Sequence, residues 1–226
     1  MAGQPYLDYP KGQIKIFLGE KPVESVFIPY AAVTFSFDEY EQKVSERFNE
    51  IGHRVKSIHH FANPVEAIKQ AGAIVVGGGN TWQLLRMMRE YNLLQAIRDK
   101  VLGGTPYIGW SAGSNVACPT IKTTNDMPIT DPQGFDALNL IPFQINPHYL
   151  DTNPDNHAGE TREQRILEFI EANRKTHVVG LREGSMLLRE NDKLSLIGNN
   201  SARIFSYAQP AAELSCNDDL SFLLKQ

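Results

Sequence analysis

The pentapeptide Gly109–Gly113 (GWSAG) holds residues that could carry out nucleophilic catalysis. It follows a short apolar run and precedes a segment of small residues, an order typical of a strand, a tight turn and a helix. Small neighbours let the chain reverse at Ser111 without clashes and expose its hydroxyl at the carboxyl edge of a sheet. The N–H of Ala112, at the start of the helix, could stabilise an oxyanion. We therefore predict a nucleophile at Ser111, against the alternative of an incidental serine in a glycine-rich turn.

A serine nucleophile needs a base, and the base needs an orienting acid. His148 follows an apolar, strand-like stretch that ends at a proline, which is a rigid position for a base. Residue types and spacing alone do not select it among the 6 histidines, and they do not select the acid among the 26 Asp and Glu residues. Cys118, a rival nucleophile, lies in an apolar stretch and is predicted to be a core thiol. We interpret His59 and His60 as surface or strand-end residues, and His157 and His177 as structural.

Three glycines, Gly77–Gly79, follow the buried run Ala73–Val76 and precede a helical pattern. Such loops expose backbone N–H groups and bind anions, so a nucleotide-phosphate site is one interpretation. Neither a Gly-x-Gly-x-x-Gly fingerprint nor a Walker lysine is present, which weakens it. The loop could instead supply a second oxyanion donor, or serve packing alone. These alternatives stay open at the level of the residues.

Short apolar runs alternate with helical patterns along the chain, and the runs are continuous rather than alternating. This pattern favours one α/β domain over residues 1–226, with a mainly parallel sheet between layers of helices. The predicted strands are 25–29, 55–59, 73–76, 107–110 and 177–181, with a hairpin of 185–189 and 193–197. The predicted helices are 38–51, 64–70, 81–88, 93–102 and 160–173.

Bulk composition excludes several functional classes. The net charge of −4 gives no basic face for nucleic acid, and no apolar stretch is long enough to cross a bilayer. The N-terminal residues contain no apolar signal-peptide core. Cys118 and Cys216 lie far apart and are predicted to be free, buried thiols in a reducing compartment. We therefore expect a cytoplasmic protein without nucleic-acid or membrane partners.

Several segments together resemble peptidase E, the α-aspartyl dipeptidase group of the serine peptidase family that also includes cyanophycinase. The resemblance extends over roughly residues 25–205, in family order. Its segments are FIPYA (27–31), VVGGGNTWQLL (75–85), YIGWSAGSNVACPTIKTTNDMPI (107–129), GFDAL (134–138), QINPH (144–148), GETREQRI (159–166) and LREG (181–184).

The resemblance implies a three-layer α/β fold like that of class I glutamine amidotransferases, a flavodoxin-like arrangement with a nucleophile elbow. It implies hydrolysis of Asp-Xaa dipeptides through an acyl-enzyme, without a cofactor or a metal ion, by a monomer or homodimer. The implied catalytic residues are Ser111, His148 and Glu183, the oxyanion hole is formed by Gly79 and Ala112, and the substrate-binding residues are Arg162, Asp126 and Asn80. Asp126 would either pair with the substrate ammonium or hold its loop. A related peptidase of cyanophycinase-like specificity and a non-catalytic anion- or nucleotide-binding paralogue are the alternatives.

One departure from the family pattern concerns the N-terminus. The family opens with an apolar strand that ends in a Ser-Asn-Ser-Thr-like segment, whereas residues 1–12 contain no such run. Residues 11–20 stand where the first helix of the family is expected. A missing central strand would expose sheet edges and apolar surface, so we expect other residues to fill the gap or the fold to lose stability.

Overall fold

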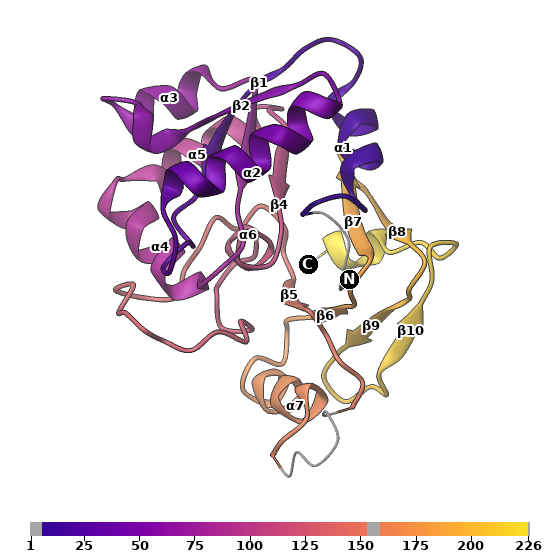
Figure 1. Cartoon of the computed structure of the whole chain (residues 1–226). Helices are drawn as coiled ribbons and strands as arrows, with labels where there is room; N and C mark the ends of the chain where they lie inside the picture. Colours follow the sequence, from indigo (N-terminus) through magenta and orange to yellow (C-terminus); the bar gives the residue numbers. More distant parts are fainter. Residues whose placement is uncertain (1–5, 153–158, 226) are drawn as a thin grey trace.

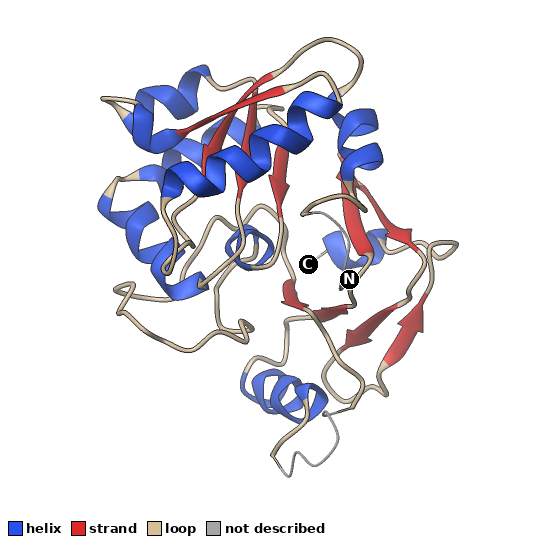
Figure 2. Cartoon of the chain, in the orientation of Figure 1, coloured by secondary structure: helices blue, strands red, loops and turns tan. Residues whose placement is uncertain are grey.

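Alternating short strands and amphipathic helices build the fold, which the computed structural model describes for residues 6–152 and 159–225 (Figures 1 and 2). No helix in these two ranges is long and apolar enough to cross a membrane. The strands are β1 (Glu24–Ile28), β2 (Arg54–Ser57), β3 (Ala73–Val76), β4 (Tyr107–Gly109), β5 (Gln144–Pro147), β6 (Val178–Leu181), β7 (Ser185–Glu190), β8 (Lys193–Gly198), β9 (Ala202–Phe205) and β10 (Ala212–Leu214). The helices are α1 (Lys11–Leu18), α2 (Phe37–Glu50), α3 (Pro64–Gln70), α4 (Thr81–Glu90), α5 (Leu93–Leu102), α6 (Ala112–Ala117) and α7 (Arg162–Ala172), with 3₁₀ turns η1 (Ile58–His60) and η2 (Ser221–Leu224).

The first sheet is fully parallel, in the order β2-β1-β3-β4, and helices cover both of its faces. Because side chains alternate along a strand, Ile74 and Val76 of β3 pack with α3, α4, α5 and α6, whereas Val75 packs with α1 and α2. All four residues of β3 are buried. The predicted three-layer architecture is therefore confirmed.

The second sheet has the order β10-β9-β6-β5, in which β5 and β6 are parallel and the other pairs are antiparallel. Helix α7 packs on one of its faces, and β8 and η2 pack on the other. The parallel strands of the molecule are thus divided between two sheets instead of forming one. β4 ends the first sheet and β5 ends the second, and they are not paired with each other.

Side chains, rather than another strand, satisfy the free edge of β5. The carbonyl of Ile145 accepts hydrogen bonds from Asn115 Nδ2 (2.9 Å) and Thr123 Oγ1 (2.8 Å). The N–H of Ile145 donates to Cys118 Sγ at 3.2 Å. Asn115 and Cys118 belong to or follow α6, so this helix joins the two sheets. Buried backbone groups need such partners wherever a neighbouring strand is absent.

Local sequence signals account for most helix boundaries. Ser36 and Glu39 form a reciprocal capping box at the start of α2, and Asn63 caps α3 in front of Pro64. Thr161 and Gln164 form a second reciprocal capping box at the start of α7. α3, α5 and β3 have the predicted bounds. The β7-β8 hairpin is confirmed with only end shifts.

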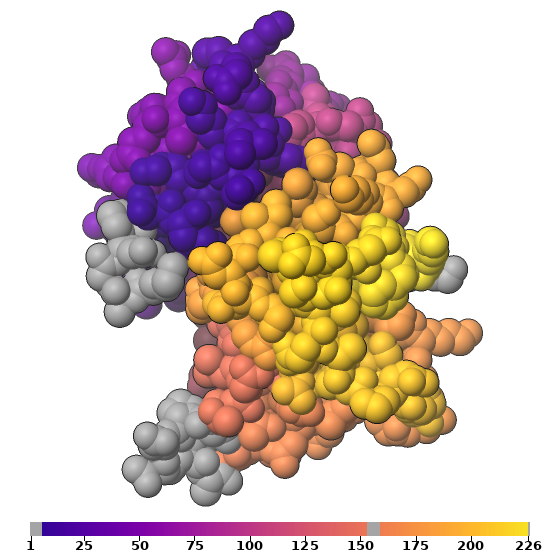
Figure 3. Space-filling view, turned by 90° about the vertical axis from the view of Figure 1, so that its right-hand side faces the viewer, coloured from indigo at the N-terminus to yellow at the C-terminus, as the bar shows by residue number. Residues whose placement is uncertain are grey.

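Two predictions about local structure were incomplete. The strand expected over 55–59 ends at Ser57, and residues Ile58–His60 form η1 instead. Both histidines of η1 contact α2. In a continued strand, these two successive side chains would point to opposite faces of the sheet. β9 and β10 were not predicted, since their short runs carry weak periodicity. Figure 3 shows the N-terminal part of the chain, in indigo, lying against the orange and yellow C-terminal part.

Candidate active site

Ser111 occupies a strained turn between β4 and α6. Its φ of 52° and ψ of −112° lie in a region that residues with a Cβ rarely adopt. The turn packs tightly below the serine, because a Cβ on Gly113 would lie 2.3 Å from the carbonyl oxygen of Val76. Ser111 is the N-cap residue of α6, and the N–H groups of Gly113, Ser114 and Asn115 are bonded to carbonyls of the turn. The predicted nucleophile elbow is present in its geometry.

The glycine loop lies against this turn. Gly79 has a φ of 133°, and a Cβ there would lie 2.3 Å from the carbonyl oxygen of Ala31, so a larger residue does not fit. A Cβ on Gly78 would lie 2.9 Å from the Cβ of Ser111, which places the loop in contact with the elbow. Within residues 6–152 and 159–225, no hydrogen bond uses the N–H of Gly79 or of Ala112. Both groups remain available as donors to an oxyanion.

His148 and Glu183 meet because β5 and β6 are parallel neighbours. The register pairs Pro147 with Leu181, so the residues that follow the two strands emerge at the same edge. His148 Nδ1 contacts Glu183 Oε1 there. Both side chains are about half exposed, so the pair is open to solvent on one side. A carboxylate on Nδ1 fixes the imidazole tautomer and leaves Nε2 to exchange protons.

The structure does not join this pair to the serine by a hydrogen bond. Among the described residues, Ser111 Oγ has no hydrogen bond to His148 Nε2 or to any other group. Catalytic hydrogen bonds are often long before substrate binds. The assignment of His148 as the base of Ser111 therefore stays a prediction, and so does the role of Glu183.

The side chains of Asp126 and Asn80 both form hydrogen bonds with other groups of the protein. Asp126 Oδ2 accepts hydrogen bonds from Thr81 N (2.8 Å), Thr81 Oγ1 (2.6 Å) and Thr124 Oγ1 (3.0 Å). Asn80 caps α4 through its side-chain oxygen, and its Nδ2 donates to the carbonyl of Met127 at 2.9 Å. These contacts favour the interpretation that Asp126 holds its loop. Contact of either residue with a substrate stays a prediction.

Arg162, the first residue of α7, is half-buried. Within the described residues, its guanidinium has no hydrogen bond or ion pair. Burial and then the neighbouring Arg165 lower its pKa, whereas the negative charge of Asp126 opposes this shift. The side chain nevertheless stays protonated at neutral pH. Arg162 is therefore a partly desolvated cation close to the loop that carries Asp126, and an incoming anion would stabilise it.

The remaining predicted polar residues have clear positions. Cys118 is buried, and burial raises the pKa of its thiol to about 12, so it is not a nucleophile at neutral pH. Cys216 is a free thiol but exposed, which corrects the prediction that both thiols are buried. It follows the exposed edge strand β10 in a polar turn. His177 bonds Ser206 Oγ through Nδ1 at 2.7 Å, as expected of a structural histidine. His157 lies outside the described residues.

The sequence analysis missed three residues that support the site. Trp110 Nε1 donates to Tyr6 Oη (2.6 Å), the hydroxyls of Tyr6 and Tyr40 share a hydrogen bond (2.7 Å), and Tyr40 Oη donates to the carbonyl of Gly78 (3.0 Å). This chain of bonds links the elbow to the glycine loop. No local signal reveals it, since Tyr40 fits the apolar face of α2 and its partners are distant in sequence.

Known proteins are similar to this chain in sequence and in fold. The model of peptidase family S51 matches residues 1–197. A peptidase E of Nostoc sp. (strain PCC 7120) is 50% identical over 224 residues, which cover 99% of this chain and 93% of that protein. A peptidase E of Shewanella amazonensis is 46% identical over 220 residues, 97% of this chain and 93% of that protein. The crystal structure of a peptidase from an acI-B1 Actinobacterium shares the fold, with a TM-score of 0.72 at 20% identity over 97% of this chain and 93% of that one. The chain therefore belongs to peptidase family S51 and is a serine peptidase.

Proposed function

We propose that this peptidase hydrolyses dipeptides whose first residue is aspartate, through an aspartyl-enzyme formed on Ser111. The observation that carries the proposal is the strained Ser111 turn in contact with the glycine loop, next to which two backbone N–H groups have no partner among the described residues. The relatives named peptidase E, at 46–50% identity, support a peptidase activity. The specificity for aspartate rests on the resemblance to α-aspartyl dipeptidases.

The chemistry follows the roles expected of a Ser-His-Glu triad. Ser111 Oγ attacks the carbonyl carbon of the scissile bond while His148 Nε2 takes the hydroxyl proton. The carbonyl oxygen becomes an oxyanion, to which the N–H groups of Gly79 and Ala112 donate. His148 then gives its proton to the leaving amine. Water attacks the ester with His148 again as base, which releases aspartate and restores Ser111.

Glu183 would act through His148 rather than on the substrate. Its carboxylate accepts the Nδ1 hydrogen of His148 and stabilises the imidazolium that forms after proton transfer. Their contact at the ends of β5 and β6 supports this role.

Arg162 is the residue that we propose reads the aspartate. A guanidinium binds a carboxylate through two parallel hydrogen bonds between opposite charges. The neutral side-chain amide of a substrate asparagine brings no negative charge to Arg162, so it should bind more weakly. The substrate β-carboxylate would give the half-buried Arg162 the partner that it lacks among the described residues. Such a dipeptide carries two charged groups close together, the β-carboxylate and the α-ammonium. Binding of both would orient the scissile carbonyl at Ser111.

The test is a panel of Asp-Leu, Asn-Leu and Ala-Leu, with β-Asp-Arg as a probe of cyanophycinase-like specificity. We expect wild type to prefer Asp-Leu, and Ser111→Ala to abolish its cleavage without loss of fold. Arg162→Ala should lower kcat/KM for Asp-Leu on the order of 10²-fold and erase the preference over Asn-Leu. Reaction with a fluorophosphonate reagent should be retained in this variant.

Arg165→Ala is the matched control, because Arg165 lies on the same helix but is exposed and pairs with Glu160 at 3.7 Å. It should keep both the rate and the preference for Asp-Leu. Equal cleavage of Asp-Leu and Asn-Leu by wild type would contradict the proposed specificity. Turnover by Ser111→Ala would contradict the mechanism.

A further inference from the structure

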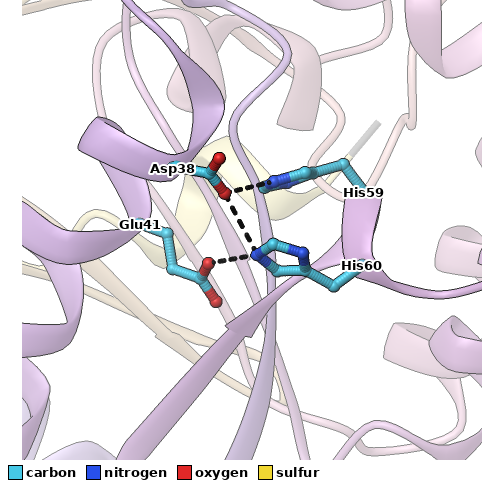
Figure 4. A group of neighbouring side chains, drawn as sticks. All are labelled: Asp38, Glu41, His59 and His60. Atoms are coloured by element: carbon cyan, nitrogen blue, oxygen red, sulfur yellow. Dashed lines mark hydrogen bonds and ion pairs between the residues drawn. The ribbon is translucent and has the colours of Figure 1, made fainter.

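Two carboxylates and two imidazoles converge on the surface where α2 begins, in a group that contains none of the residues proposed for catalysis (Figure 4). Asp38 and Glu41 lie one turn apart at the start of α2, and His59 and His60 lie in η1. One ligand atom from each residue can be chosen so that all four lie within 4.8 Å of one another. Within the described residues, this is the group of His, Cys, Asp and Glu that could hold a metal ion.

The distances in this cluster are equal to or shorter than those between ligands of one small ion. His59 Nε2 lies 2.9 Å from Asp38 Oδ1, and His60 Nε2 lies 3.3 Å from the same oxygen. His60 Nε2 lies 2.7 Å from Glu41 Oε2. Ligands about 2.05 Å from a tetrahedral zinc ion are about 3.3 Å apart. An ion would therefore fit after the closer contacts lengthen by about half an ångström and the more distant side chains rotate.

Surrounding hydrogen bonds position the ligands in the manner of metal sites. Ser57 Oγ contacts His59 Nδ1 at 2.6 Å, and the N–H of Ser57 donates to Glu41 Oε1 at 2.6 Å. If Nδ1 of His59 carries its hydrogen, it donates to Ser57 and leaves the Nε2 lone pair directed toward the carboxylates. In the other tautomer, Nε2–H donates to Asp38 and Ser57 donates to Nδ1, so a bound ion would replace the bond to Asp38 and select the first tautomer.

Burial of the cluster is also suited to a bound ion. The side chains of His59 and Glu41 are 22% and 18% exposed, so half of the ligand set is already ordered and partly desolvated. Asp38 and His60 face solvent and leave a path of entry. Mixed imidazole and carboxylate donors suit zinc and neighbouring transition metals, whereas Mg²⁺ and Ca²⁺ favour oxygen alone.

We propose that Asp38, Glu41, His59 and His60 bind one divalent transition-metal ion, with Zn²⁺ as the ion that their donors fit best. The ion would fasten the start of α2 to η1, and so stabilise the folded protein. None of these four residues is proposed to contact the peptidase substrate, so the test does not depend on that substrate.

The experiment uses the full chain without a histidine tag, stripped with a chelator and titrated with Zn²⁺ by calorimetry at pH 7.5. We expect one tight site, a rise in Tm with Zn²⁺, and no comparable response to Mg²⁺. The double variant His59→Gln/His60→Gln should lose the site and the rise in Tm. Ser57→Ala removes only the supporting hydroxyl and should weaken binding about tenfold or more.

The matched control is Glu46→Gln, an exposed carboxylate further along α2, which should bind Zn²⁺ as wild type does. Far-UV circular dichroism and peptidase activity in chelator establish that the double variant is folded. The proposal fails if wild type binds no Zn²⁺ in this assay. It also fails if the folded double variant binds Zn²⁺ with wild-type stoichiometry and affinity, which would place the ion elsewhere.

Discussion

At the residue scale, the contact of His148 with Glu183 depends on unusual backbone at one position. His148 has a φ of 54°, directly after the last residue of β5. This conformation turns the side chain out of the strand direction and toward the end of β6, where Glu183 contacts Nδ1. A residue held in this region is strained, and such strain is common where a side chain must be aimed at a partner. The geometry thus supports a positioning role for Glu183.

Glu183→Gln tests that role, because glutamine keeps the size of the side chain and removes its charge. We expect kcat on Asp-Leu to fall by about 10²- to 10⁴-fold, since the imidazolium loses its carboxylate and His148 can take the wrong tautomer. Tm should change little at this half-exposed position. Glu190→Gln, at the exposed end of β7, is the control and should leave kcat unchanged. A Glu183→Gln enzyme with wild-type kcat would remove Glu183 from the triad.

At the element scale, the segment before α1 connects two loops that the sheets alone would leave separate. Tyr6 lies between Trp110, next to Ser111, and Tyr40, which donates to Gly78 in the glycine loop. Burial raises the pKa of both Tyr6 and Tyr40, so their hydroxyls stay protonated and can donate. The N-terminal segment is therefore part of the framework that holds the glycine loop beside the Ser111 turn.

Tyr6→Phe should loosen this framework without emptying the space that the ring fills. The change removes two of the three hydrogen bonds, and we expect kcat/KM on Asp-Leu to fall about three- to tenfold. Tyr207→Phe is the control, because Tyr207 is exposed and stacks with Arg174 far from these loops in sequence. Wild-type kcat/KM in Tyr6→Phe would show that the hydrogen-bond chain does not support the site.

The elements that could be predicted from sequence are those whose signals are local. α2 was predicted to within one residue because Tyr40, Val44 and Phe48 repeat at helical spacing and are all buried. The pairing of His148 with Glu183 could not be derived in this way, since it depends on β5 and β6 being neighbours in a sheet. Only the family resemblance selected those two residues.

His59 and His60 illustrate the same limit for a possible binding site. Their pattern predicted surface or strand-end residues, and no nearby residue in the sequence suggests a metal ligand set. Their carboxylate partners are about 20 positions away, in α2. His59 and His60 do follow the end of β2, and His60 is exposed, whereas the convergence on Asp38 and Glu41 is visible only in three dimensions.

At the scale of the whole molecule, the site forms where two sheets meet. The first sheet supplies Ser111 and the glycine loop, and the second supplies His148 and Glu183. Because β4 and β5 are not paired, their relative position depends on α6, which packs between them and whose Asn115 donates to the carbonyl of Ile145. The internal order of the second sheet then determines where His148 and Glu183 lie.

Arg182, which directly follows β6, connects several segments of the second sheet through hydrogen bonds and ion pairs. Its guanidinium, 17% exposed, donates to Asp151 after β5, to the carbonyl of Ser201 before β9, and to Glu213 in β10. Hydrogen bonds from Arg182 are the largest cause of the lowered pKa of both Asp151 and Glu213. Folding therefore favours the ionised form of both carboxylates.

The sign of the pH dependence follows from those lowered pKa values. The unfolded chain binds protons at these carboxylates near pH 4, while the folded protein does so only at lower pH. The stability that Arg182 provides is thus complete above about pH 5 and declines as the pH falls through the folded pKa values.

Arg182→Met should lower the free energy of unfolding at pH 7 by about 2 kcal/mol, after allowance for solvent screening of the half-exposed carboxylates. The difference between wild type and variant should narrow between pH 5 and pH 3.5, as measured by urea unfolding at several pH values. Arg174→Met is the control, since its pair with Glu171 is exposed on both sides and should contribute little. A difference that stays constant or widens toward acid pH would mean that Arg182 stabilises the sheet by packing rather than by its charge.

The same variant also tests the connection between sheet and site, because Glu183 is the next residue. A loss of activity at pH 7 larger than the loss of folded protein would indicate that Arg182 holds the end of β6 in the position that Glu183 needs.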